Sequence, residues 1–314
     1  MESVTPGRAN RGQLLLVSAI ALAIFLVALA MILSTAIYSE SLATGGDTTT
    51  DERAAIQYQS AVDRHASESL ERVNSANYST YDSLEANLSQ EVATWNDVSA
   101  RHSAGEGAAS AVTITSITDG TRVLQHDADR NFSNRNGESS WQVAQNVTAV
   151  RDFRMTVSRD SLHNPGNESC DESGDCFDVI VENGTDTWIA SVSRSGNDVV
   201  VTVENSSGAV ETCSESGTTI AIDFSAGTIA DSNCSALQFE QDREEPYSIA
   251  FDDADAVAGS YELTADRQFP SVPSLESTPA YEPVIYDVTL DVSYQTAAVT
   301  YQTEHRVTPG DSDG

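Results

Sequence analysis

The sequence predicts an α+β protein, with an N-terminal transmembrane helix and a helical stem followed by a mostly antiparallel, β-rich extracellular domain. Three observations predict this class. A run of 24 residues, Leu14–Ile37, is apolar except for Ser18, Ser34 and Thr35. Apolar residues then recur at helical spacing through the next segment. From Ser110 onward, apolar and polar residues alternate as they do in strands.

The apolar run is long enough to cross a membrane. As a helix it spans about 36 Å, more than the ~30 Å hydrocarbon core of a bilayer. A cleaved secretory signal, with Ser34-Thr35-Ala36 as a rough cleavage site, is the alternative, but such signals have shorter apolar regions. Arg8 and Arg11 precede the run and acidic residues follow it. The positive-inside rule therefore places the N-terminus in the cytoplasm and the chain after Tyr38 outside the cell membrane.

The same patterns predict the boundaries of the segments. We expect a cytoplasmic leader at 1–12, the transmembrane helix at 13–38, a linker at 39–50, a helical stem at 51–104 and the β-rich extracellular domain at 110–308. Asp82 and Glu85 resemble a capping box at the second stem helix. Each stem helix has one apolar face, which predicts packing against the β domain or a neighbouring subunit. The two faces consist of Ala55, Tyr58, Val62, Ala66, Leu70 and Val73, and of Leu84, Leu88, Val92, Trp95 and Val98.

The charge balance is strongly acidic. There are 48 Asp and Glu against 16 basic residues, a net charge of −32, and every basic residue is Arg. Such like charges repel one another at ordinary ionic strength, but molar salt shortens the screening length to roughly 3 Å. The composition therefore predicts an extreme halophile. An acidic disordered tail is a poor alternative because the charges are spread through strand-like segments. Nucleic acid is excluded as a partner, since no basic stripe is present.

Glycosylation sequons and cysteines also indicate an extracellular domain. Eight of the 15 Asn residues begin a sequon, where chance would give roughly three. They are Asn77, Asn87, Asn131, Asn146, Asn167, Asn183, Asn205 and Asn233. The four cysteines form two local pairs, Cys170/Cys176 and Cys213/Cys234, which predict two disulfides outside the cell. Three pairings are possible, of which the local one is favoured, and a four-thiolate zinc site is the rival.

The sequence offers little evidence of catalysis. Asp127, Asp129, Asn131 and Glu138 follow the spacing of a calcium loop, although Phe132 occupies the position that needs Gly. None of the five His lies in a metalloprotease motif. A carboxylate-based glycosidase remains an alternative. We expect a protein that is not an enzyme and has no cofactor, with Ca²⁺ as a minor alternative.

The N-terminal segment resembles a known class of surface protein. Arg11-Gly12-Gln13, followed directly by the apolar run, is similar to the class III signal of archaeal prepilins. The resemblance implies cleavage between Gly12 and Gln13 by a prepilin peptidase. With its helical stem and β-rich head, the chain resembles minor or accessory haloarchaeal type IV pilin-like proteins.

This resemblance implies a non-enzymatic subunit of a type IV pilus-related filament or of its accessory machinery. Its partners would be the membrane and other pilin-like subunits, which pack through the N-terminal helix. Small residues at helical spacing would permit close packing there, namely Ala19 with Ala23 and Ala30 with Ser34. The alternative is a permanently membrane-anchored extracellular domain that binds a ligand or organises the envelope.

Overall fold

The computed structural model describes residues 48–76, 78–166, 170, 175–208, 210–239, 245–269 and 279–310. The chain divides into two compact units, Met1–Arg53 and Ala54–Gly314, and the second contains nearly all of the described residues. The predicted transmembrane helix at 13–38 lies outside the described residues. Neither helix in the described part of the chain has the length and apolar character needed to span a bilayer.

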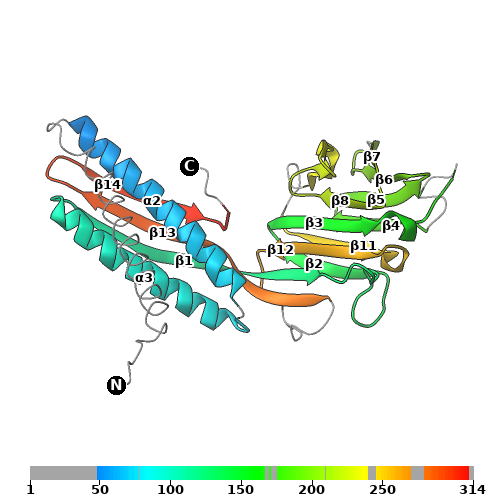
Figure 1. Ribbon diagram of the computed structural model, residues 1–314, viewed down its shortest axis with the longest axis horizontal. Coiled ribbons are helices and arrows are strands. Elements are labelled where there is room, and N and C mark those ends of the chain that lie inside the picture. Colours follow the sequence, from blue (N-terminus) through cyan, green and yellow to red (C-terminus); the bar gives the residue numbers. More distant parts are fainter. Residues whose placement is uncertain are drawn as a thin grey trace, which may run out of the picture. The chain divides into compact units, whose positions relative to one another are not determined.

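The described strands form two antiparallel sheets (Figure 1). The eight-stranded sheet has the order β10-β9-β8-β3-β12-β1-β13-β14. Its strands are β1 (Ala109–Gln125), β3 (Val150–Ser158), β8 (Thr219–Asp223), β9 (Thr228–Ile229), β10 (Ser232–Asn233), β12 (Gly259–Ala265), β13 (Ala280–Gln295) and β14 (Thr300–Val307). β1 and β13 are the longest strands, and they pair with each other from Ala109 to Leu124 of β1.

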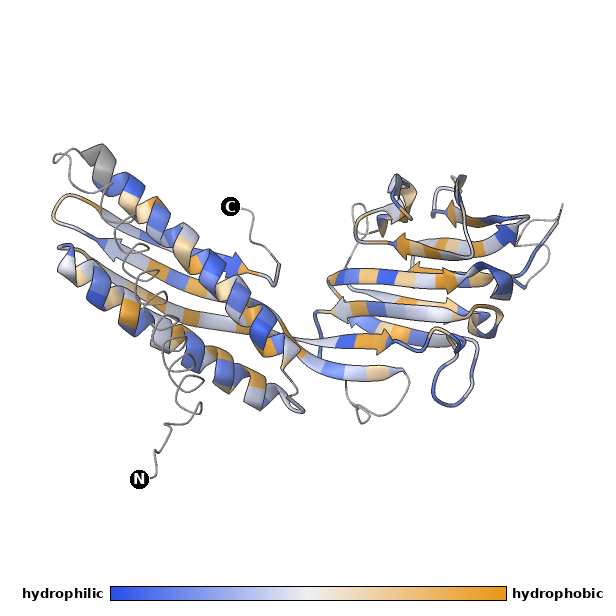
Figure 2. Ribbon diagram, viewed as in Figure 1, coloured by the Kyte–Doolittle hydropathy of each residue, from blue (hydrophilic) through white to orange (hydrophobic). Residues whose placement is uncertain are grey.

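The second sheet has six strands, in the order β2-β11-β4-β5-β6-β7. They are β2 (Trp141–Val147), β4 (Phe177–Glu182), β5 (Thr187–Ser195), β6 (Asp198–Glu204), β7 (Val210–Ser216) and β11 (Tyr247–Asp252). Among the described residues, three short 3-10 helices lie in the connections, at Arg159–Ser161, Ser235–Leu237 and Ala254–Ala256. The strands alternate between buried and more exposed residues, as β6 and β11 do, and Figure 2 shows the matching alternation in hydropathy.

The two sheets enclose one hydrophobic core and so form a β-sandwich. Aromatic rings from both sheets meet in it: Phe251 of β11 lies 5.2 Å from Tyr261 of β12 and 5.7 Å from Trp141 of β2, in edge-to-face geometry. Phe132, in the connection between β1 and β2, is fully buried and contacts rings from both sheets. Such pairs are worth about 0.5–1.5 kcal/mol beyond their area burial, which favours one packing of the two sheets.

A separate core lies where two helices cover β1, β13 and β14 (Figure 1). The helices are α2 (Thr48–Ser75) and α3 (Tyr81–Gly105). Leu70 of α2 and Leu88 of α3 are fully buried and share this core with Leu290 of β13. Both helices are amphipathic, with apolar residues on the buried face and hydrophilic residues elsewhere (Figure 2).

The predicted fold class is therefore wrong. The helices at 51–104 do not form a stem that precedes a β-rich domain, because their apolar faces are covered by strands from both ends of that domain's sequence. In the described residues the protein is a mostly antiparallel β protein in which two helices cover one part of the larger sheet, and no helix there can span a membrane. The start of α3 also differs from the expected capping box. Thr80 is the N-cap, and its hydroxyl accepts a hydrogen bond from Ser83 N at 3.4 Å.

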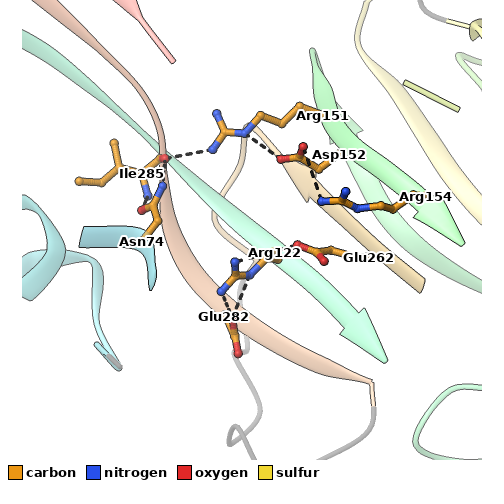
Figure 3. Close-up of polar contacts among 8 residues, drawn as sticks. All are labelled: Asn74, Arg122, Arg151, Asp152, Arg154, Glu262, Glu282 and Ile285. Atoms are coloured by element: carbon orange, nitrogen blue, oxygen red, sulfur yellow. Dashed lines mark hydrogen bonds and ion pairs between the residues drawn. The ribbon is translucent and has the colours of Figure 1, made fainter. Parts of the chain in front are cut away.

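A polar junction fixes the helical layer to the sandwich (Figure 3). The side-chain amide of Asn74, near the end of α2, donates to Ile285 O and accepts from Ile285 N, both at 2.8 Å. β14 pairs with β13 only from Val288 onward and so does not reach Ile285. The Asn74 side chain instead forms hydrogen bonds with the backbone of Ile285, as a neighbouring strand would. Arg151 of β3 also donates to Ile285 O, and its guanidinium lies 4.5 Å from the ring centre of Tyr286.

The disulfide Cys213–Cys234 joins the two sheets at one side of the sandwich. Cys213 lies on β7, the edge strand of the six-stranded sheet, and Cys234 directly follows β10, the edge strand of the other sheet. Ser232 donates to Glu215 across the same side. Cys170–Cys176 closes a short loop before β4. The sequence-local pairing is therefore confirmed, and the four cysteines are all in disulfides.

Removing the Cys213–Cys234 bond should destabilise the protein more than removing the other one. The loop it closes separates the two cysteines by 21 positions, against 6 for Cys170–Cys176. Chain entropy then predicts losses of about 3 and about 2 kcal/mol in the free energy of unfolding. Guanidinium unfolding of Cys213→Ala/Cys234→Ala and Cys170→Ala/Cys176→Ala proteins, in molar salt, measures both. A larger loss for the Cys170/Cys176 variant than for the Cys213/Cys234 variant would show that the inter-sheet bond does not restrain the unfolded chain as described.

His65 of α2 is a titratable group within the helical layer. Its ring stacks on Trp95 of α3, with centroids 5.2 Å apart. Burial lowers the pKa of His65, and Arg72 lowers it further, while Glu68 and Glu91 oppose both effects. The neutral imidazole is therefore favoured in the folded protein.

This shift predicts a loss of stability in mild acid. The folded-state pKa of His65 lies below the ordinary value of 6.5, so the unfolded chain binds more protons between the two values. The free energy of unfolding should then fall as the pH falls below 6.5. The free energy of unfolding should be measured at pH 7.5 and at a lower pH. Between the two, it should fall less for His65→Gln than for the wild type. Burial raises the pKa of Asp63, which acts with the opposite sign, but that effect is common to both proteins.

Candidate functional site

An open groove of about 860 Å³ lies beside edge strand β2. β2 lies at the end of its sheet opposite β7, so in strand order the groove is at the other side from the Cys213–Cys234 bond. Three segments line it: the loop and strand at 134–146, the segment 267–269 after β12, and 279–281 at the start of β13. Small-molecule sites typically have volumes of about 300–1,000 Å³, so the groove is large enough for a ligand.

Three of the described residues that line the groove are aromatic. Trp141 is the most buried, and its indole N–H donates to Phe132 O at 2.9 Å. Phe269 and Tyr281 are partly exposed and meet edge to face, with centroids 6.0 Å apart. Burial raises the pKa of Tyr281, an effect that the nearby positive charge of Arg135 reduces, so the phenol stays protonated at neutral pH. The groove thus offers a ligand aromatic ring faces and a phenol hydroxyl.

The described lining of the groove is less acidic than the chain as a whole. Arg135 and Arg267 line it, and Glu138 is the one acidic residue among the described lining residues. Glu138 accepts a hydrogen bond from the Asn134 side chain at 2.6 Å. The remaining polar lining is mostly amide and includes Gln142. A surface with guanidinium and amide groups suits a ligand rich in hydroxyl or carboxylate oxygens.

Thr121 of β1 positions one wall of the groove. Its buried hydroxyl donates to Arg267 O at 2.8 Å and accepts from Phe269 N at 3.1 Å. The hydroxyl of Tyr81, at the start of α3, lies 2.9 Å from the same oxygen. These contacts fix the backbone that carries Arg267 and Phe269, so the groove wall is tied to both the larger sheet and the helical layer.

A bulge in β2 shapes the opposite wall. Tyr247 of β11 pairs with Val147 and Ile249 pairs with Ala144, so β2 has an extra residue between these pairs. Asn146 lies in the bulge with φ of 53°, in the left-handed region that Asn tolerates better than most residues. Its carbonyl accepts from Arg267 Nη1 at 2.8 Å, which ties the two walls together.

The structure describes six of the eight predicted glycosylation residues, and none of the six is buried. Asn146, Asn205 and Asn233 are exposed, and Asn87, Asn131 and Asn183 are partly exposed. Asn183 and Asn205 lie in the turns after β4 and β6, where each side chain accepts a hydrogen bond from a backbone N–H two residues on. Asn77 and Asn167 lie outside the described residues, as do Arg11, Gly12 and Gln13 of the predicted processing site. Glycosylation and processing stay predictions.

The residues of the predicted calcium loop are not gathered around one point. The Asp127 carboxylate accepts from Asp129 N at 3.2 Å, and Glu138 is bonded to Asn134. Phe132, between them, is buried in the sandwich core. In the described ranges no three His, Cys, Asp or Glu residues are grouped so that they could hold a metal ion. The calcium alternative is untested.

Sequence reasoning did not predict the groove. Its lining comes from three segments that are far apart in the chain, and no motif in the sequence joins them. One available signal was the position of Arg135 and Arg267, each within a few residues of an exposed aromatic or amide residue in a chain with few cations.

Comparison with known proteins gives one match. The model of the Family of unknown function (DUF7261) matches residues 8–115, about a third of the chain. The match covers the apolar N-terminal segment, the helices α2 and α3, and the first residues of β1. It does not include the groove. No curated protein and no solved structure matches the chain.

Proposed function

We propose that this chain is a non-enzymatic surface protein of a halophile, a pilin-like subunit of a type IV pilus-related filament or of its accessory machinery. Its apolar N-terminal segment packs with equivalent segments of other subunits after the leader is removed at Gly12. The β-sandwich, with its glycans, faces the medium. A prepilin peptidase is the partner that processes it.

The observation that supports this proposal most is the packing of the chain that follows the apolar segment. α2 begins at Thr48, eleven positions after Ile37 at the end of the apolar run, and its apolar face from Ala55 to Val73 packs on the larger sheet. Val62 and Leu70 are buried there, and Asn74 is bonded to β13. An N-terminal assembly segment would thus be joined to a well-packed head. The two disulfides and the accessible sequon residues support a location outside the cell.

Shearing cells tests the proposal. Filaments sheared from the native host should contain the wild-type chain, whereas a Gly12→Val variant, whose cleavage site is lost, should be absent from them and stay with the cells. An Arg8→Gln variant leaves Arg11-Gly12-Gln13 intact and serves as the control. Wild-type protein that never enters the sheared fraction, or Gly12→Val protein that enters it equally, would contradict the proposal.

A further inference from the structure

One glycosylation sequon borders the groove. Of the six described sequon residues, Asn146 alone lines it. Three hydrogen bonds from two segments fix the backbone of the sequon: Asn146 N donates to Ser248 Oγ at 3.2 Å, Asn146 O accepts from Arg267, and Thr148 N donates to Asp266 at 3.0 Å. The Asn146 side chain is nevertheless exposed. A sugar attached to it would therefore start at a defined point on the rim of the groove.

The groove has the chemistry that an oligosaccharide needs. Phe269 and Tyr281 offer apolar ring surface to the C–H groups of a sugar ring. Arg135 and Arg267 offer N–H donors to hydroxyl or carboxylate oxygens. Arg267 uses Nη1 for Asn146 O, and a guanidinium has five N–H donors, so the same side chain can bind the glycan and its attachment residue.

We propose that the groove holds the N-linked oligosaccharide attached to Asn146, so that this glycan packs on the protein while those at Asn183 and Asn205 extend into solvent. Covalent attachment raises the local concentration of the sugar to the millimolar range, so individually weak contacts are sufficient. The glycan covers the partly exposed rings of Phe269 and Tyr281 and stabilises the edge of β2. This inference rests on the glycosylation in the proposed function but not on filament assembly.

The experiment compares glycosylated and unglycosylated full-length protein. Glycopeptide mass spectrometry of protein from the native host first determines the occupancy of Asn146. Thermal unfolding is then measured for the wild type, Asn146→Asp and Asn205→Asp. Asp tolerates the left-handed conformation at position 146, and in the turn at position 205 it keeps the oxygen that accepts from Ser207. We expect Asn146→Asp to lower the melting temperature by about 3 °C or more, and Asn205→Asp by less than about 1 °C.

Protein made in a host without N-glycosylation separates the glycan from the side chain. There, both variants should melt within about 1 °C of the wild type. Phe269→Ala, combined with Asn146→Asp, gives a second measurement. In glycosylated protein the two effects should be less than additive, because both remove the same contact, and in unglycosylated protein they should add.

An unmodified Asn146, equal shifts for the two Asp variants, or a shift that persists without glycosylation would each overturn the inference. None of these results affects the shearing experiment. Conversely, absence of the chain from filaments would contradict the proposed function and leave the outcome of this test unchanged.

Discussion

Gly259→Ala should unfold the protein or lower its free energy of unfolding by more than about 4 kcal/mol. Gly259 begins β12 with φ of 155°, and a β-carbon there would lie 1.9 Å from Thr156 O of β3. Neither backbone can move away, since the strands pair from Gly259 and Val157 onward. Gly259 O also accepts from the buried Gln125 side chain at 3.0 Å. Chemical unfolding in molar salt measures the loss, with yield of folded protein as a second readout.

Gly208→Ala is the matched control for this substitution. Gly208 has φ of 74°, but nothing lies within 4 Å of the position a β-carbon would take. Only conformational strain is added, which costs about 1 kcal/mol. Similar losses for the two variants would contradict the close approach of β12 to β3.

Leu88→Ala should lower the free energy of unfolding by about 2–5 kcal/mol, the range for truncating a buried Leu. Leu88 is fully buried among Leu70 of α2, Val112 of β1 and Leu290 of β13. The truncation leaves a cavity between the helices and the sheet, which close-packed neighbours fill only partly. Leu70→Ala, on the other helix, should have a loss in the same range.

Val98→Ala, on the same helix as Leu88, provides the control. Val98 is 62% exposed, so its truncation should change the free energy of unfolding by less than about 0.5 kcal/mol. If Leu88→Ala had as little effect, α3 would not pack on the sheet, and the correction of the predicted helical stem would itself be wrong. Denaturant unfolding of the three variants beside the wild type decides this.

The helical and strand patterns of the sequence predicted much of the secondary structure. Leu84, Leu88 and Val92 do share the buried face of α3. Val98 was wrongly included, because at 100° per residue it lies off that face, and the buried face continues to Ser103. In β13, Val288 to Tyr294 alternate between buried and partly exposed residues as predicted.

Tertiary contacts explain what the patterns could not predict. Around Ile285 both faces of β13 are buried, because the strand passes from the sandwich into the helical layer at the junction formed by Asn74 and Arg151. Nothing in the sequence indicates that the Asn74 side chain forms hydrogen bonds with β13 where a neighbouring strand would otherwise pair. The same holds for the groove, whose walls are joined through Thr121 and Arg267 from distant segments.

The N-terminus of the mature protein tests the central proposal most directly. Mass spectrometry of the chain isolated from its native host gives that terminus without any variant. A chain that begins at Gln13 is the result we predict, because processing after Gly12 is what makes the apolar segment available for filament assembly. A chain that still begins at Met1 or Glu2 would contradict the pilin-like function and leave a surface protein that keeps its leader.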